Sequence, residues 1–131
     1  MDAAITILVV EDDDLIHDVL GEALVDGGFT VAQASSASDA LAMIEAPDAP
    51  YRALVTDINL EQGRPTGWDI AKRAREINPV LPVIYMTGKS GNEWAAYGVP
   101  NSILLTKPFA PAQLIAAVSQ LLNAATTPPA S

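Results

Sequence analysis

The fold is decided by the stretch Arg52-Ala53-Leu54-Val55-Thr56-Asp57-Ile58-Asn59-Leu60. A short apolar run of this kind is typical of a buried strand, and the strand ends on the carboxylate of Asp57. In an open parallel sheet, ligands and reactive groups lie at the carboxyl ends of the strands. Asp57 is therefore a candidate nucleophile or metal ligand, and the alternative is an aspartate that caps the following turn.

Length and composition limit the classes of protein to which the chain can belong. Its 131 residues suit one domain, and 50% hydrophobic with 18% charged residues predicts a folded globule. The absence of cysteine excludes disulfides, thiolate metal sites and cysteine nucleophiles. The formal net charge of −9 argues against binding to nucleic acid or to an anionic membrane. Since neither a signal peptide nor a membrane-spanning run is recognisable, we expect a cytoplasmic location.

Hydrophobic periodicity predicts five strands that alternate with five helices. The expected strands are residues 5–10 and 29–34, the stretch ending at Asp57, and residues 82–87 and 102–106. Strict alternation predicts an α/β fold with a parallel sheet, right-handed crossovers and helices on both faces. We expect one domain over residues 1–123 and a disordered tail over residues 124–131, where Ala, Thr, Pro and Ser leave nothing to bury.

Capping signals mark where the helices begin. Ser36-x-x-Asp39 and Thr66-x-x-Asp69 are capping-box patterns that open the second and third helices. The other helices are expected over residues 15–24, 92–97 and 111–122.

Polar residues recur at the ends of the expected strands. Glu11-Asp12 directly follow strand one, Asp57 and Thr87 end strands three and four, and Lys107 directly follows strand five. Three carboxylates within several ångströms repel one another, at a cost on the order of a few kcal/mol for each close pair. A hard divalent cation relieves this repulsion, and oxygen ligands of this kind suit Mg²⁺ better than Ca²⁺. The alternative for the acids after the first strand is a solvated helix start that the helix dipole favours.

Lys107 turns this expected metal site into a candidate site for phosphoryl transfer. An ammonium beside a carboxylate can pair with it at rest and with a phosphoryl oxygen after transfer. The hydroxyl of Thr87 can donate a hydrogen bond to a second phosphoryl oxygen. The alternative for Lys107 alone is an ordinary surface lysine in a loop.

These motifs together resemble the receiver domain of response regulators in two-component signalling, the CheY-like superfamily. The matching segments are Val10-Glu11-Asp12, Asp57, Thr87-Gly88 and Lys107-Pro108-Phe109. The resemblance covers residues 5–123 and implies a doubly wound, flavodoxin-like sheet with strand order 2-1-3-4-5. It further implies a stand-alone, single-domain receiver.

The resemblance also implies a role for each acidic position. Asp57 would be the phosphoacceptor, and Asp12 and Asp57 would be Mg²⁺ ligands. Glu11 would be the partner of Asp12 in the acidic pocket, and Asn59 would supply its backbone carbonyl to the metal.

Further implications concern the fourth and fifth strands, where the chain also departs from the family pattern. Thr87 would be the switch hydroxyl, and Lys107 would precede a cis peptide bond to Pro108. Leu104 stands where receivers usually carry an aromatic residue that moves on activation. The loop 61–67 is longer than usual.

Several other residues are candidates for secondary roles. We expect Asn59 and Lys89 to tune hydrolysis of the phosphorylated form. His17 is expected to be a solvent-facing residue of the first helix, with a phosphotransfer histidine as the alternative. Trp94 and Tyr97 are candidates for a partner-binding face, because exposed aromatic residues mark interfaces.

Four functions are compatible with this sequence to different degrees. The first is a switch that accepts a phosphoryl group from a histidine kinase or a phosphotransfer protein. Such a switch is not a conventional enzyme, because it catalyses only its own phosphorylation and dephosphorylation. A nucleotide- or flavin-binding module is disfavoured, because four acids after the first strand would repel a phosphate. A metal-dependent aspartyl phosphohydrolase would need a second acid where Asn59 stands. The fourth is a receiver-like interaction module that works without phosphorylation.

Overall fold

The computed structural model describes residues 5–60, 65–88 and 94–126. Five parallel strands form one sheet in the order β2-β1-β3-β4-β5. They are β1 (Thr6–Val10), β2 (Thr30–Ala34), β3 (Tyr51–Asp57), β4 (Val83–Thr87) and β5 (Ser102–Thr106). The predicted α/β class and strand order are confirmed.

Among the described residues, four helices have nine or more residues, and a fifth helical element is a single turn. The long helices are α1 (Asp14–Asp26), α2 (Ala37–Glu45), α3 (Gly67–Ile77) and α5 (Pro111–Thr126). The turn α4 (Trp94–Tyr97) is shorter than the helix expected over residues 92–97, whose first two residues lie outside the described part of the chain. Within the described ranges, no helix is long and apolar enough to cross a membrane.

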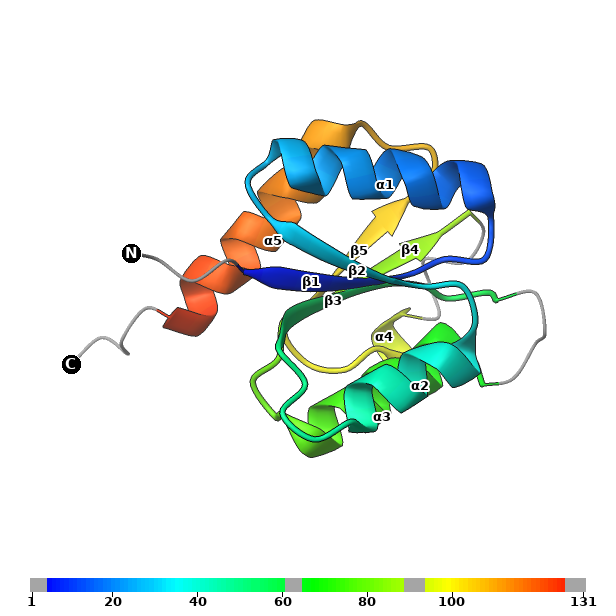
Figure 1. Ribbon diagram of the computed structural model, residues 1–131, viewed down its shortest axis with the longest axis vertical. Coiled ribbons are helices and arrows are strands. Elements are labelled where there is room, and N and C mark those ends of the chain that lie inside the picture. The colour runs from blue at the N-terminus through cyan, green and yellow to red at the C-terminus, as the bar shows by residue number, and fades with distance from the viewer. Residues whose placement is uncertain (1–4, 61–64, 89–93, 127–131) are drawn as a thin grey trace.

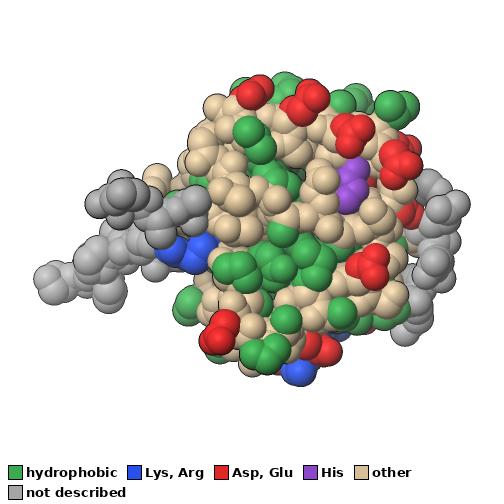
Figure 2. All heavy atoms as spheres, in the orientation of Figure 1, with side chains coloured by type: hydrophobic (Ala, Val, Ile, Leu, Met, Phe, Trp, Pro, Cys, Tyr) green, Lys and Arg blue, Asp and Glu red, His purple; other side chains and the backbone are tan. Residues whose placement is uncertain are grey.

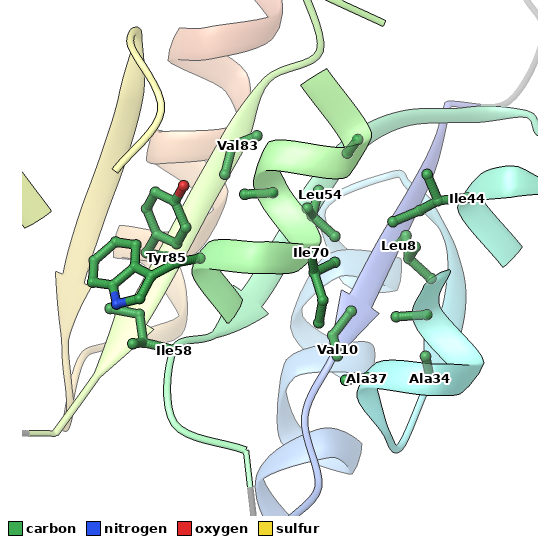
Figure 3. Close-up of a cluster of buried hydrophobic side chains, with 14 of the residues drawn as sticks. Leu8, Val10, Ala34, Ala37, Ile44, Leu54, Ile58, Ile70, Val83 and Tyr85 are labelled. Carbon is green, nitrogen blue, oxygen red and sulfur yellow. The ribbon is translucent and has the colours of Figure 1, made fainter. Parts of the chain in front are cut away.

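Helices cover both faces of the sheet, with α1 and α5 on one face and α2, α3 and α4 on the other (Figure 1). Side chains alternate across a strand, so β1 contributes to a core on each face. Leu8 and Val10 pack under α2 and α3, whereas Ile7 and Val9 pack under α1 and α5. Figure 3 shows the first of these cores, in which Ile70 of α3 lies among side chains of the sheet.

The predicted helix caps are present in the structure. The side chain of Thr66 accepts from the backbone N–H of Asp69, whose carboxylate accepts from the backbone N–H of Thr66, which completes a capping box. Ser36 caps α2 by accepting from the backbone N–H of Asp39. Each such cap stabilises its helix by about 1 kcal/mol. The Thr66 cap also fixes the start of α3 beside the end of β3.

The expectation for His17 was wrong. Its side chain is only 5% exposed, because His17 lies on the same face of α1 as Leu20 and Leu24, which pack on the sheet. The outward face of α1 instead carries Leu15 and Val19, which are 79% and 54% exposed. Apolar residues lie on both faces of α1, so helical spacing alone did not identify the inward one.

The last helix also extends beyond its expected end. α5 runs to Thr126, three residues into the segment expected to be a disordered tail, and residues 127–131 lie outside the described ranges. Alanines at 124 and 125 have high helix propensity, which accounts for the extension.

Candidate functional site

The site lies at the carboxyl edge of the sheet, where the ends of β3, β4 and β5 are held in register. The backbone N–H of Ile58 donates to the carbonyl of Met86 at 3.0 Å, just beyond β3. The backbone N–H of Lys107 donates to the carbonyl of Thr87 at 2.7 Å, just beyond β5. These bonds extend the parallel ladders and bring the side chains that follow the strands to one place.

Lys107 joins two of the acidic side chains. Its Nζ donates to Oε1 of Glu11 at 2.8 Å and to Oδ2 of Asp57 at 3.1 Å. The Glu11 side chain is 1% exposed, that of Asp57 is 10% exposed and that of Lys107 is 22% exposed. Because water screens buried charges poorly, this pair of contacts is stronger than a surface ion pair.

The burial of this cluster changes how it binds protons. Burial raises the pKa of Glu11 to about 7, and the nearby Asp57 carboxylate adds to the rise, while the hydrogen bond from Lys107 opposes it. Burial alone would lower the pKa of Lys107, but its hydrogen bonds to Glu11 and Asp57 outweigh burial and raise the pKa. Lys107 is therefore a fixed cation at neutral pH, and Glu11 is the group that titrates.

Three carboxylates form a set that can hold a cation. Glu11, Asp12 and Asp57 each offer one oxygen, and these oxygens lie within 4.8 Å of one another. The backbone N–H of Asp12 donates to Oε2 of Glu11 at 3.0 Å, which orients the first acid. Oxygen ligands at this spacing fit a small, hard divalent cation.

The turn after β3 holds the carboxylate of Asp57 from its own backbone. The N–H of Asn59 donates to Oδ1 of Asp57 at 3.2 Å, so both oxygens of this carboxylate have hydrogen-bond donors. Gly67, the first residue of α3, donates its N–H to the carbonyl of Ile58 at 2.9 Å. A Cβ at Gly67 would lie 2.2 Å from the carbonyl oxygen of Asp57, so only glycine allows α3 to begin this close to Asp57.

The other expected site residues lie around this cluster. Thr87 ends β4 and is buried, with an exposed fraction of 1%. The side chain of Asn59 is exposed, and the peptide bond between Lys107 and Pro108 is cis as the resemblance implied. Lys89 and residues 61–64 of the longer loop lie outside the described ranges.

An apolar groove beside the site was not anticipated from the sequence. It has a volume of about 480 Å³ and borders Lys107. Its walls include Leu15, Val19 and Ala23 of α1 and Pro108, Phe109 and Pro111 of the segment after β5. The sequence feature that could have indicated the groove is the second row of apolar residues on α1, which does not pack into the core. We call this feature the α1 groove.

Comparisons with known proteins agree with this geometry. The family profile described as "Response regulator receiver domain" matches residues 7–119. A crystal structure of a response regulator receiver protein from Sinorhizobium medicae is 46% identical, with a TM-score of 0.90, and the match covers 93% of this chain and 97% of that one.

Two curated relatives are longer than this chain. A response regulator receiver protein from Anaeromyxobacter is 38% identical over 86% of this chain and 43% of its own length. The transcriptional regulatory protein CusR from Escherichia coli is 30% identical over 89% of this chain and 51% of its own length. The chain thus spans about half the length of these relatives. The profile match and the identity to the Sinorhizobium protein show that the chain belongs to the response regulator receiver domain family.

Proposed function

We propose that the protein is a phosphoryl-accepting switch, in which Asp57 receives a phosphoryl group from a histidine kinase or a phosphotransfer protein. The observation that carries this proposal is the position of Lys107, whose ammonium bridges Glu11 and Asp57 at 2.8 and 3.1 Å. A lysine that only stabilised the fold would not need to lie at the reactive end of the sheet. Here it is placed to neutralise charge on the acceptor.

In the proposed reaction, a carboxylate oxygen of Asp57 forms a bond to phosphorus while the bond from phosphorus to the donor nitrogen breaks. The donor imidazole leaves with the electron pair of that bond. Lys107 then pairs with a phosphoryl oxygen in place of the Asp57 carboxylate, and the hydroxyl of Thr87 donates to another. The reaction therefore depends on positioning and on charge balance at one edge of the sheet.

Mg²⁺ is the cation we propose for the acidic set. Asp12, Asp57 and the backbone carbonyl of Asn59 would hold it, with Glu11 as their acidic partner. When bound, Mg²⁺ supplies positive charge that offsets repulsion among the carboxylates and the incoming phosphoryl oxygens. The three carboxylate oxygens within 4.8 Å support this assignment.

The α1 groove is the docking site that we propose for the phosphodonor, because the groove is apolar and borders Lys107. Along the exposed side of α1, a row of acids repeats at four-residue intervals beside it. The row consists of Asp14, Asp18, Glu22 and Asp26. Acidic side chains gather along the upper edge of the molecule in Figure 2, where α1 lies in Figure 1. A donor with apolar side chains flanked by basic ones would complement this surface.

We expect the double substitution Leu15→Ala and Val19→Ala to lower kcat/KM for transfer from a protein donor about tenfold, since two apolar contacts are lost. Transfer from acetyl phosphate should be unchanged, because that donor does not use the groove. A panel of phosphorylated histidine kinases can serve as protein donors to the wild-type protein and to the double variant. Val25→Ala is the matched control, since Val25 is 58% exposed on α1 and lies outside the groove. Equal losses with both kinds of donor would contradict docking in the groove.

The proposed function is tested directly by incubation with acetyl phosphate and Mg²⁺, followed by intact mass measurement. We expect the mass to increase by one phosphoryl group, and a chelator to prevent the increase. An unchanged mass in the folded protein would favour an interaction module that works without phosphorylation. Continuous release of inorganic phosphate from many phosphate esters would favour a phosphohydrolase.

The output of the switch is proposed to be a change in the surface formed by α4, β5 and α5. The added charge of about −2 at Asp57 would draw Lys107 and Thr87 toward the phosphoryl group. Thr87 ends β4 and Lys107 directly follows β5, and both strands lead to this surface.

A further inference from the structure

We infer that Trp68 couples the backbone at Asp57 to α4, and that it does so through direct ring contacts with Tyr85 and Tyr97. This inference rests on the proposed function only in its account of what drives the change. Its structural basis is a continuous chain of contacts from the end of β3 to the first residue of α4.

The first link is the contact between the start of α3 and the end of β3. Gly67 lies against the backbone of Asp57 and Ile58, and its N–H donates to the carbonyl of Ile58. Trp68 is the next residue, and its position is fixed further by the Thr66–Asp69 capping box. A shift of the backbone at Asp57 therefore moves Trp68 directly, because no flexible segment lies between Gly67 and Trp68.

The second link is the ring of Trp68, which touches two other aromatic rings. Its centroid lies 4.6 Å from that of Tyr85 and 6.2 Å from that of Tyr97, in tilted arrangements. Trp68 is 8% exposed and Tyr85 is fully buried, so the first pair can move only together with its surroundings. Tyr85 and Ile58 belong to the same buried cluster (Figure 3), which places the rings near the turn that follows Asp57.

The third link is a hydrogen-bonded path from Tyr85 to α4. The hydroxyl of Tyr85 accepts from the backbone N–H of Val99 at 3.0 Å. The carbonyl of Val99 accepts from the hydroxyl of Ser102 at 2.7 Å, and this hydroxyl accepts from Nε1 of Trp94 at 2.9 Å. Hydrogen bonds thus link the indole of Trp94 to the hydroxyl of Tyr85 through the turn between α4 and β5.

The position of Leu104 explains why this route matters in this chain. Leu104 is paired with Tyr85 across the β4–β5 ladder and packs against the same core. The aromatic ring at this place in the sheet therefore comes from β4 instead of β5. Unlike a side chain that swings from an exposed to a buried position, Tyr85 is already buried and held at both its ring and its hydroxyl. Coupling then requires a shared shift of packed rings.

The test follows the indole N–H signal of Trp94 by ¹H–¹⁵N NMR. With Mg²⁺ and beryllofluoride, a stable mimic of the phosphoryl group, we expect this signal to shift in the wild-type protein. In Trp68→Leu the shift should fall by at least half, while uptake of one phosphoryl group from acetyl phosphate persists by mass. Tyr97 is 51% exposed, so Tyr97→Leu should fold normally and should also reduce the shift. Trp68→Phe, which keeps a ring, should respond between Trp68→Leu and the wild type.

Ile44→Val is the matched control, because Ile44 is buried in the same core but lies on α2. It should respond like the wild-type protein. A full Trp94 shift in both Trp68→Leu and Tyr97→Leu would overturn the coupling, as would an unchanged Trp94 signal in wild-type protein loaded with beryllofluoride.

A second measurement separates this inference from the proposed function. Coupling is reciprocal, so Tyr97→Leu should shift the backbone amide signal of Gly67 in the absence of any phosphoryl group. If the wild-type protein takes up no phosphoryl group but Tyr97→Leu shifts the Gly67 amide signal, the proposed function is contradicted and the coupling is not. If the protein is phosphorylated normally but Tyr97→Leu leaves the Gly67 amide signal unchanged, the coupling is contradicted and the proposed function is not.

Discussion

Replacing Asp57 with asparagine is expected to abolish phosphoryl uptake from acetyl phosphate completely. The amide has nearly the shape of the carboxylate but lacks the negative oxygen that must attack phosphorus. The substitution also removes one of three acidic oxygens within 4.8 Å of one another, so affinity for Mg²⁺ should fall as well. Intact mass after incubation with acetyl phosphate and Mg²⁺ measures the first effect, and titration with Mg²⁺ measures the second.

Asp18→Asn is the matched control for this experiment, because it makes the same chemical change at an exposed position on α1. It should accept one phosphoryl group as the wild-type protein does. A phosphoryl group found on the Asp57→Asn protein would place the acceptor elsewhere and would refute the proposed mechanism. Equal loss in both variants would point to a general effect of charge.

Metal-free protein is expected to lose stability as the pH rises from about 5 to about 8. The cause is Glu11, whose pKa is about 7 in the folded protein against 4.5 for the same carboxyl in an unfolded chain. Between these values the folded state binds one more proton than the unfolded state, so the free energy of unfolding falls with rising pH. A difference of this size corresponds to a loss on the order of 3 kcal/mol. Denaturant unfolding at several pH values measures it.

Two comparisons assign this pH dependence to Glu11. Glu11→Gln keeps a hydrogen-bonding side chain without a titrating proton, so its unfolding free energy should vary much less across this range. Saturating Mg²⁺ should reverse the trend in the wild-type protein, because a cation favours the deprotonated acids. A wild-type protein whose stability is constant between pH 5 and 8, or a Glu11→Gln variant with the wild-type slope, would contradict this account.

The strands and helix caps show how much of the fold can be predicted from local sequence. β5 begins and ends where the pattern predicts, and Thr66 and Asp69 form the expected capping box. These features depend on residues within a few positions of one another, so their physical causes can be read directly from the chain. The end of the last helix was less well predicted, because a run of alanines continues a helix without any further packing.

The burial of His17 and the α1 groove depended on tertiary contacts instead. Helical spacing identified apolar residues on α1, but the sheet and α5 decided which of them are covered. Leu15 and Val19 were left outside, where they line the groove together with Phe109. A polar residue, His17, took one of the inward positions. Periodicity alone could not rank these faces, since both carry apolar side chains.

The order of residues along the chain is enough to predict the alternation of strands and helices, and with it the edge of the sheet at which the acids and Lys107 would collect. How these groups meet depends on packing between distant segments, because the Lys107 and Glu11 side chains that lie 2.8 Å apart are separated by 96 positions in the chain. The same packing buries Glu11, which raises the pKa of that carboxyl to about 7. Burial and distance depend on how the layers pack, and packing is a property of the whole fold.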